Sequence, residues 1–205
     1  MDKSYYFNDK NVLAENEQYL LRKQLSEDKE VYYNLFSEIS IIKGRMEENM
    51  FRKYFEKIWV EEQNEDAIRV SIILREDGAY VGNITLRELN SKTPELGIDV
   101  VRRYQRQGVA YDALRLFMRQ VSSISKIDYF LARIYSNNEP SLGLFQKLGA
   151  TFIGKEPSEY QAFLNQLKDK DDENYECLIN LHPEMENIAG GKFIAHYKVT
   201  YKDIE

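Results

Sequence analysis

A short polar turn stands between an apolar, β-branched segment and an amphipathic helical pattern, and its sequence is Gln105-Arg106-Gln107-Gly108-Val109-Ala110. The first N–H groups of a helix lack partners inside the helix, and the helix dipole places positive charge behind them. Gly108 lets the backbone approach a phosphate oxygen, Ala110 is small, and Arg106 adds a cation at the rim. The turn therefore predicts a site for a pyrophosphate.

Two neighbouring patterns strengthen this prediction. Upstream, Glu95–Val101 is an extended segment in which Ile98, Val100 and Val101 are β-branched. Downstream, residues 128–135 indicate another strand, and Asn138 then opens a short helix that runs to Leu148. A strand, a glycine turn and a helix occur in many α/β proteins, so the turn alone also fits a purely structural role.

With these segments in place, the sequence resembles the GNAT superfamily of N-acetyltransferases, most closely the branch that acetylates the N-termini of ribosomal proteins. The resemblance covers roughly Tyr19 to Gly154 and the last predicted strand. It implies an α+β fold in α/β/α layers, with a mixed, mostly antiparallel sheet of about six to seven strands flanked by helices. It also implies transfer of an acetyl group from acetyl-CoA to a primary amine, either a protein or peptide α-amine or a small-molecule amine.

The resemblance assigns cofactor contacts residue by residue. Gln105-x-x-Gly108-x-Ala110 matches the family turn that holds the pyrophosphate of acetyl-CoA, and Asn138 with Ser141 matches a helix start that also faces the cofactor. Strand-end backbone groups pair with the pantetheine arm in the family. The implied cofactor-binding residues are Val100, Val101, Gln105, Arg106, Gln107, Gly108, Val109, Ala110, Asn138 and Phe145.

Acetyl transfer needs a neutral amine, a polarised thioester carbonyl and a departing thiolate. A backbone N–H at the end of the 95–101 strand can act as an oxyanion-type donor. Glu95, Asp99 and Glu88 are the candidate general bases, acting directly or through water, if the strand prediction holds. The alternative is that each is a surface or ion-paired carboxylate.

Protonation of the leaving thiolate poses a separate question. Many family members place a Tyr four residues after the Ser of the helix start, and this chain has Phe145 there. Another group, such as a different tyrosine, or water can replace that acid, or turnover is slow. A non-catalytic acyl-CoA-binding or protein-interaction module on the same fold is therefore the alternative function. A nucleotide-binding protein is less favoured, because Gly-x-Gly-x-x-Gly and the P-loop Lys are missing.

The remaining elements follow from periodicity and turn residues. The predicted strands are residues 19–23, 68–74, 80–86, 95–101, 128–135, 151–155 and 192–201, and the predicted helices are residues 26–39, 46–63, 109–121, 138–148 and 158–167. Asp77-Gly78 predicts a hairpin. We expect an N-terminal arm at 1–18 and one domain at 19–205, with an acidic insertion at about 156–191 that tunes specificity, forms a subunit contact or is simply solvated.

Composition narrows the classes of partner. The net charge of −6 and the pI near 5.2 argue against nucleic acid, because phosphate contacts need clustered Lys and Arg. The single Cys177 excludes an internal disulfide, and His182 and His196 lack metal-ligand spacing, so no metal is expected. One Cys, no signal peptide and no long apolar run favour a cytoplasmic protein that does not enter membranes. A homodimer is compatible with these expectations.

Overall fold

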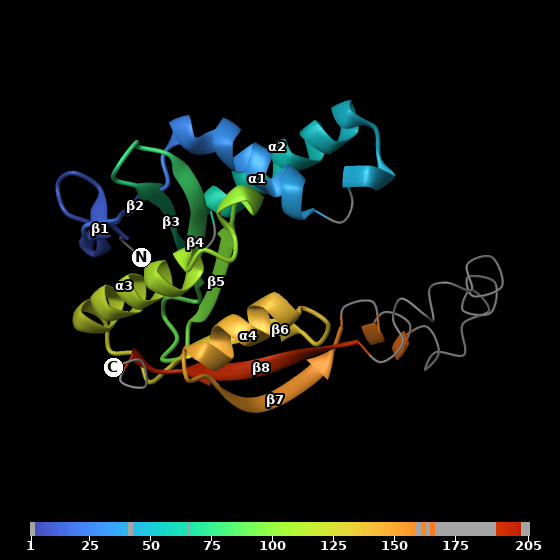
Figure 1. Cartoon of the computed structure of the whole chain (residues 1–205). Helices are drawn as coiled ribbons and strands as arrows, with labels where there is room; N and C mark the ends of the chain where they lie inside the picture. Colours follow the sequence, from blue (N-terminus) through green and yellow to red (C-terminus); the bar gives the residue numbers. More distant parts are fainter. Residues whose placement is uncertain are drawn as a thin grey trace. The chain divides into compact units, whose positions relative to one another are not determined.

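The computed structural model describes residues 3–40, 43–64, 66–158, 161–162, 165–166 and 192–201. The chain divides into two compact units (Figure 1). The first comprises Met1–Phe130 with Thr200–Glu205, and the second comprises Leu131–Val199. The predicted division into an arm at 1–18 and one domain at 19–205 stays a prediction.

Five antiparallel strands form the sheet of the first unit, in the order β1-β2-β3-β4-β5. Their bounds are β1 Val12–Glu15, β2 Tyr19–Lys23, β3 Ala67–Leu74, β4 Tyr80–Arg87 and β5 Glu95–Val100. The hairpin predicted at Asp77-Gly78 joins β3 to β4. There Gly78 has a φ of 74°, and the Ala79 N–H donates to Asp77 Oδ1 at 2.9 Å. The chain reverses here because glycine tolerates this left-handed conformation.

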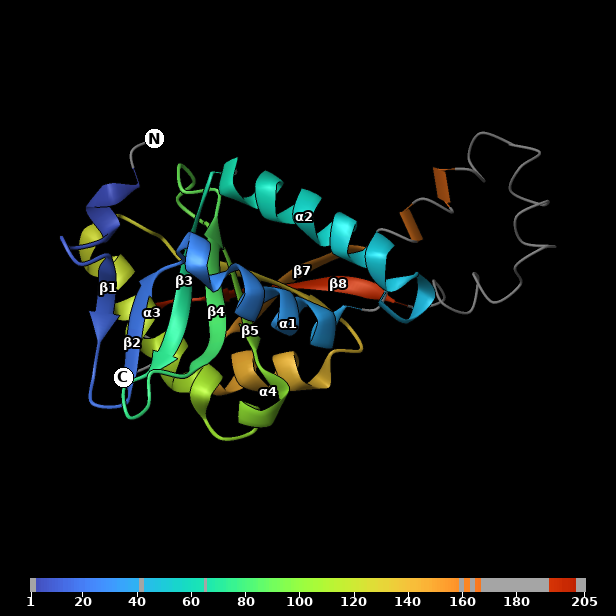
Figure 2. The same ribbon diagram turned by 90° about the horizontal axis from the view of Figure 1, so that it is seen from above.

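Three α-helices belong to the first unit: α1 Lys29–Ile39, α2 Glu48–Asn64 and α3 Val109–Ile124. They are accompanied by the 3-10 helices η1 Ser4–Tyr6, η2 Ser26–Asp28, η3 Lys43–Arg45 and η4 Arg102–Tyr104. Helices α1 and α2 lie on one face of the sheet and α3 lies on the other (Figures 1 and 2). The buried side of α3 carries Val109, Ala113, Leu114, Phe117, Met118 and Val121. Ala110, the second residue of α3, is only partly buried.

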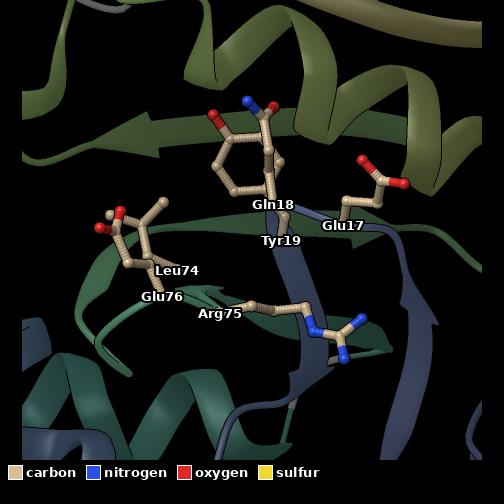
Figure 3. A pocket seen from close by; sticks show the side chains of 6 residues that line it. All are labelled: Glu17, Gln18, Tyr19, Leu74, Arg75 and Glu76. Atoms are coloured by element: carbon tan, nitrogen blue, oxygen red, sulfur yellow. The ribbon is translucent and has the colours of Figure 1, made fainter.

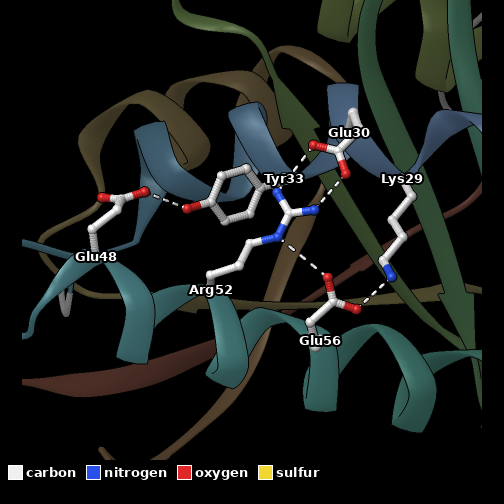
Figure 4. Close-up of polar contacts among 6 residues, drawn as sticks. All are labelled: Lys29, Glu30, Tyr33, Glu48, Arg52 and Glu56. Atoms are coloured by element: carbon white, nitrogen blue, oxygen red, sulfur yellow. Dashed lines mark hydrogen bonds and ion pairs between the residues drawn. The ribbon is translucent and has the colours of Figure 1, made fainter.

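An aromatic cluster packs α1 against α2. It comprises Tyr32, Tyr33, Leu35, Phe51, Phe55 and Trp59, all buried. On its outer side, the Arg52 guanidinium lies 4.2 Å from the Tyr33 ring and binds the carboxylates of Glu30 and Glu56 (Figure 4). Tyr33 Oη donates to Glu48 Oε1 at 2.5 Å. These contacts join the two helices into one support.

A buried ion pair fixes the start of α1 to the sheet. Asp28 accepts two hydrogen bonds of 2.7 Å from Arg22 on β2 and one of 2.8 Å from Ser71 Oγ on β3. The Leu25 N–H donates to the same carboxylate at 2.9 Å. Burial by itself raises the pKa of Asp28, but these hydrogen bonds outweigh it and hold the pKa below its usual value.

The second unit contains the strands β6 Phe130–Tyr135, β7 Thr151–Pro157 and β8 Phe193–Val199, and the helix α4 Glu139–Lys147. The first residue of β6, Phe130, is assigned to the first unit. The strand order is β6-β8-β7, and β7 and β8 are antiparallel. The Ser136 N–H, just after β6, donates to the Phe193 carbonyl at 2.8 Å.

The predicted elements agree with the structure to within three residues at their ends, apart from two differences. The described residues contain eight strands, not six or seven, because residues 12–15 of the predicted arm form β1. Asn16 makes that strand pair with β2, since its Oδ1 accepts from Gln18 and Tyr19 N–H groups. Of the predicted helix at 158–167, residues 161–162 and 165–166 are described and helical, and most of the insertion at 156–191 lies outside the described residues.

Candidate functional site

The turn before α3 contains two residues in the left-handed backbone region. After η4, Arg106 has a φ of 61° and Gly108 has a φ of 87°. Gly108 is also the N-cap of α3 and supplies no side-chain cap. Because a residue with a side chain rarely adopts this region, the turn is an unusual conformation that requires support from its surroundings.

The backbone N–H groups of this turn have no acceptor within the described part of the chain. Among the described residues, none accepts a hydrogen bond from the N–H groups of Arg106, Gln107, Gly108, Val109 or Ala110. The neighbouring Gln105 and Gln107 side chains donate to the Val100 and Arg103 carbonyls at 2.9 and 2.7 Å. The turn is thus a run of exposed donors at the positive end of α3, which is an arrangement that binds anions.

The end of β5 leads into this turn and presents one backbone face to it. The Val101 N–H is already engaged, because it donates to the Val81 carbonyl of β4 at 2.9 Å. Backbone groups of successive strand residues point to opposite sides, so the Val100 N–H points away from β4. Of the two predicted strand-end residues, Val100 is therefore the one whose N–H is not used by β4.

The sheet face beneath α1 and α2 is polar. Strand register places four side chains in one cross-strand row, with Arg22 opposite Ser71, Ser71 opposite Asn83, and Asn83 opposite Asp99. Neighbours in such a row have Cβ atoms about 5 Å apart. Ser71 and Asn83 are buried. The row begins in the Asp28 ion pair and ends one residue before Val100.

Asp99 is the member of this row with unusual electrostatics. Its carboxylate accepts no hydrogen bond from the described residues, and burial raises its pKa against the opposing charges of Arg87 and Arg69. Burial likewise raises the pKa of Tyr32 and of Tyr80, with a smaller contribution from the charge of Asp99 in each case. A desolvated carboxylate with a raised pKa is a stronger base than an ordinary surface carboxylate.

Glu95 and Glu88 have different surroundings. Glu95 lies on the same sheet face as Asp99, with Oε1 3.5 Å from Arg87 Nη1. It is four residues from Asp99, a distance of about 13 Å along a strand, so the two carboxylates do not serve one reacting atom together. Glu88 is exposed just after β4 and has a φ of 58°.

The two predicted residues of the second unit have clear local roles. Asn138 is the N-cap of α4, and its Oδ1 accepts from the Ser141 N–H at 3.2 Å. Phe145 is buried. Capping and packing account for both residues within their own unit.

An open pocket of about 580 Å³ lies elsewhere in the first unit, where β2 begins and β3 ends (Figure 3). Its lining is Glu17, Gln18, Tyr19, Leu74, Arg75 and Glu76. None of the predicted site residues lines it. Within the described part of the chain, no group of three His, Cys, Asp or Glu residues is placed to hold a metal ion, and no helix is long and apolar enough to span a membrane.

The family model described as acetyltransferase (GNAT) domain matches residues 18–151. This chain belongs to the GNAT acetyltransferase family. The match includes β2 to α4, and hence the turn at Gly108, Asp99 and the cap at Asn138. No curated protein matches the chain.

Solved structures of GNAT acetyltransferases have the same fold. A spermidine N-acetyltransferase chimera of SpeG from Vibrio cholerae and hSSAT is 15% identical, with a TM-score of 0.63 over 92% of this chain and 99% of that chain. RimL, a ribosomal L7/L12 alpha-N-protein acetyltransferase in complex with coenzyme A, is 13% identical, with a TM-score of 0.61 over 93% and 97%. MccE, a microcin C7 self-immunity acetyltransferase in complex with acetyl-CoA and AMP, is 15% identical, with a TM-score of 0.59 over 90% and 93%. The expected α+β fold is confirmed.

The sequence analysis missed the polar row, although its signal is present in the chain. Polar residues alternate with apolar ones at Arg69 and Ser71 in β3, and at Asn83 and Thr85 in β4. Both strands were predicted from their Ile and Val residues, and the alternating polar positions were not considered. Strand pairing was also needed to show that the polar positions of four strands line up beside Asp99.

The raised pKa of Asp99 predicts a pH-dependent effect of the variant Asp99→Asn on stability. The folded protein holds this proton more tightly than the unfolded chain, where the pKa is about 3.9. Asp99 therefore contributes most stability below that value and loses it as pH rises through the folded pKa. Urea unfolding from pH 4 to 7 should show the variant gaining free energy of unfolding relative to wild type. Glu88→Gln is the control for an exposed carboxylate, and a pH-independent difference for Asp99→Asn would contradict the assignment.

Proposed function

We propose that this protein is an N-acetyltransferase that moves an acetyl group from acetyl-CoA to a primary amine of a peptide or a small molecule. Two facts support the proposal: membership of the GNAT acetyltransferase family, and the N–H groups of Arg106–Ala110 at the start of α3, for which no described residue is an acceptor. The N–H groups carry the argument, because they are the feature through which this chain can hold a pyrophosphate.

The residues present fit a coenzyme A pyrophosphate. The N–H groups of Arg106–Ala110 have no acceptor among the described residues, and Gly108 is exposed and has no side chain to cover the turn. RimL and MccE contain coenzyme A and acetyl-CoA in their structures. We assign the pyrophosphate to Gln105–Ala110 and the thioester end to Val100 and Val101. For Asn138 and Phe145 the cofactor role remains a prediction from the family resemblance.

Acetyl-CoA supplies a thioester when bound, and the protein must then deprotonate the amine and polarise the carbonyl. Asp99 is the preferred base, because it lies next to the strand end, lacks a hydrogen-bond donor among the described residues and has a raised pKa. The Val100 N–H is the preferred donor to the carbonyl oxygen. Glu95 is less suited, because it is farther along the strand and close to Arg87.

Phe145 favours one alternative, a module that binds acyl-CoA without turning it over. It offers no hydroxyl to protonate a thiolate. A general acid contributes roughly 10²- to 10⁴-fold to a rate, whereas a thiol with a pKa of about 8.5 is a fair leaving group unaided. The missing hydroxyl therefore predicts slow catalysis more readily than none.

Thiol release separates the enzyme from the binding module. Wild-type protein with acetyl-CoA should release coenzyme A faster when an amine from a panel of peptides with free α-amines, polyamines and amino acids is added. An added amine should accelerate release because its nucleophilic attack on the thioester is the step that limits the release of coenzyme A. If coenzyme A binds with micromolar affinity and no amine accelerates release, the binding module is the better description.

Substitution of Gly108 tests the anion site by itself. In Gly108→Val a β-branched residue must adopt a φ of 87°, so the turn should distort and the Kd of coenzyme A measured by calorimetry should rise at least tenfold. Gly78→Val is the matched control, because Gly78 has a φ of 74° in the β3–β4 hairpin and open space around it. Equal affinity in Gly108→Val and wild type would remove the assignment.

Asp99→Asn should lower kcat by about 100-fold, a typical loss for a general base, and leave the KM for acetyl-CoA unchanged. The wild-type log kcat/KM should fall with a slope of 1 below the pKa of Asp99, because the carboxylate must be ionised to take the proton of the amine, and should level off above that pKa. In the variant the amine must lose its proton to solvent, so the slope of 1 should continue up to the pKa of the amine. Glu95→Gln is the control, and a larger loss in that variant would move the base to Glu95.

A further inference from the structure

Glu38 lies in the last turn of α1 and contacts a different part of the chain. Its Oε2 accepts a hydrogen bond from the Arg102 backbone N–H at 2.9 Å. An acidic side chain at the C-terminal end of a helix faces the negative end of the helix dipole, which is locally unfavourable. The hydrogen bond to Arg102 offsets that cost and gives this exposed carboxylate a defined partner.

The contact supplies the cap that η4 otherwise lacks. Arg102 is the first residue of η4, and its N-cap, Val101, provides no side-chain hydrogen bond. The first N–H groups of a helix need an acceptor from outside the helix. Glu38 provides one from 64 residues away.

The same contact ties the anion-binding turn to the rest of the protein. Gln107 donates to Arg103 within the segment, and Gln105 donates to the carbonyl of Val100 at the end of the preceding strand, β5. Within the described part of the chain, the Glu38 contact is the one hydrogen bond that joins residues 102–107 to an element remote in sequence. Val101 adds an apolar contact, since its side chain packs against the α1–α2 aromatic cluster.

We propose that Glu38 is a positioning residue for the turn at Gln105–Ala110. By holding the Arg102 amide, its carboxylate fixes η4, and η4 sets where the left-handed residues Arg106 and Gly108 begin. Helix α1 is a firm support, because Asp28 anchors its start and the Arg52 contacts join it to α2. The effect on coenzyme A follows from the proposed function, whereas the effect on η4 does not depend on it.

Hydrogen exchange of the ligand-free protein tests the cap. In Glu38→Ala, the hydrogen-bonded amides of Arg102, Tyr104 and Gln105 should exchange about tenfold faster than in wild type. Glu38→Gln keeps an acceptor oxygen and should remain close to wild type. Glu27→Ala removes an exposed carboxylate beside the start of α1 and serves as the charge control. Unchanged exchange in Glu38→Ala, with melting temperature also unchanged, would overturn the proposal.

Coenzyme A binding by calorimetry tests the consequence. The Kd should rise about fivefold in Glu38→Ala, as expected for loss of one surface hydrogen bond to a charged group, and Glu38→Gln should restore most of the affinity. Equal loss in both variants would show a charge effect and refute positioning. If wild type fails to bind coenzyme A while exchange responds to Glu38 as expected, the proposed function fails and the cap stands.

Discussion

The N–H groups in the first turn of an α-helix have no acceptor within the helix itself. At the start of α3, no described residue supplies an acceptor from outside the helix. Gly108 is the N-cap of α3 and offers no side-chain hydrogen bond to these N–H groups. Arg106 and Gly108 reverse the chain direction through left-handed backbone conformations. The amide side chains nearby donate to carbonyls and so do not compete for the N–H groups. In a protein with a net charge of −6, the proposed anion site at this turn would depend on backbone dipoles more than on net charge.

The sheet that leads to this turn has two different faces, and each requires its own support. Toward α3 the packing is apolar, with Leu114, Phe117 and Val121 fully buried. Toward α1 and α2 the sheet presents the polar row from Arg22 to Asp99. This row can be buried because Asp28 forms an ion pair with Arg22 and accepts a hydrogen bond from Ser71. Unpaired polar groups would destabilise such a face. Asp99, at the end of the row, accepts no such hydrogen bond from the described residues, and burial raises the pKa of its carboxyl.

The sequence was sufficient for the elements and for the turn, because both depend on local signals. Glycine at a strand-to-helix junction, the alternation of β5 and the stripe of α3 each involve residues close together in the chain. β1 was missed because Val-Leu-Ala-Glu is short and not strongly β-branched, and it pairs only through the turn at Asn16. Glu38 and the polar row were beyond local reasoning, since Glu38 meets Arg102 across 64 residues and the row needs the register of four strands. The acid at the end of α1, against the helix dipole, was the one local hint.

The choice of acceptor follows from the same electrostatics. Removing the proton from a lysine-type amine with a pKa of about 10.4 costs about 4.6 kcal/mol at pH 7, whereas an α-amino group with a pKa near 7.7–8.0 costs only about 1 kcal/mol. The raised pKa of Asp99 reduces the difference in pKa between the base and either amine. Arg87 and Arg69 oppose that rise, so Asp99 is still a weaker base than either amine. No stronger base is found on this face among the described residues. With Asp99 as the proposed base, we therefore expect α-amines to be better acceptors than lysine side chains, because a carboxylate can offset the smaller deprotonation cost more readily.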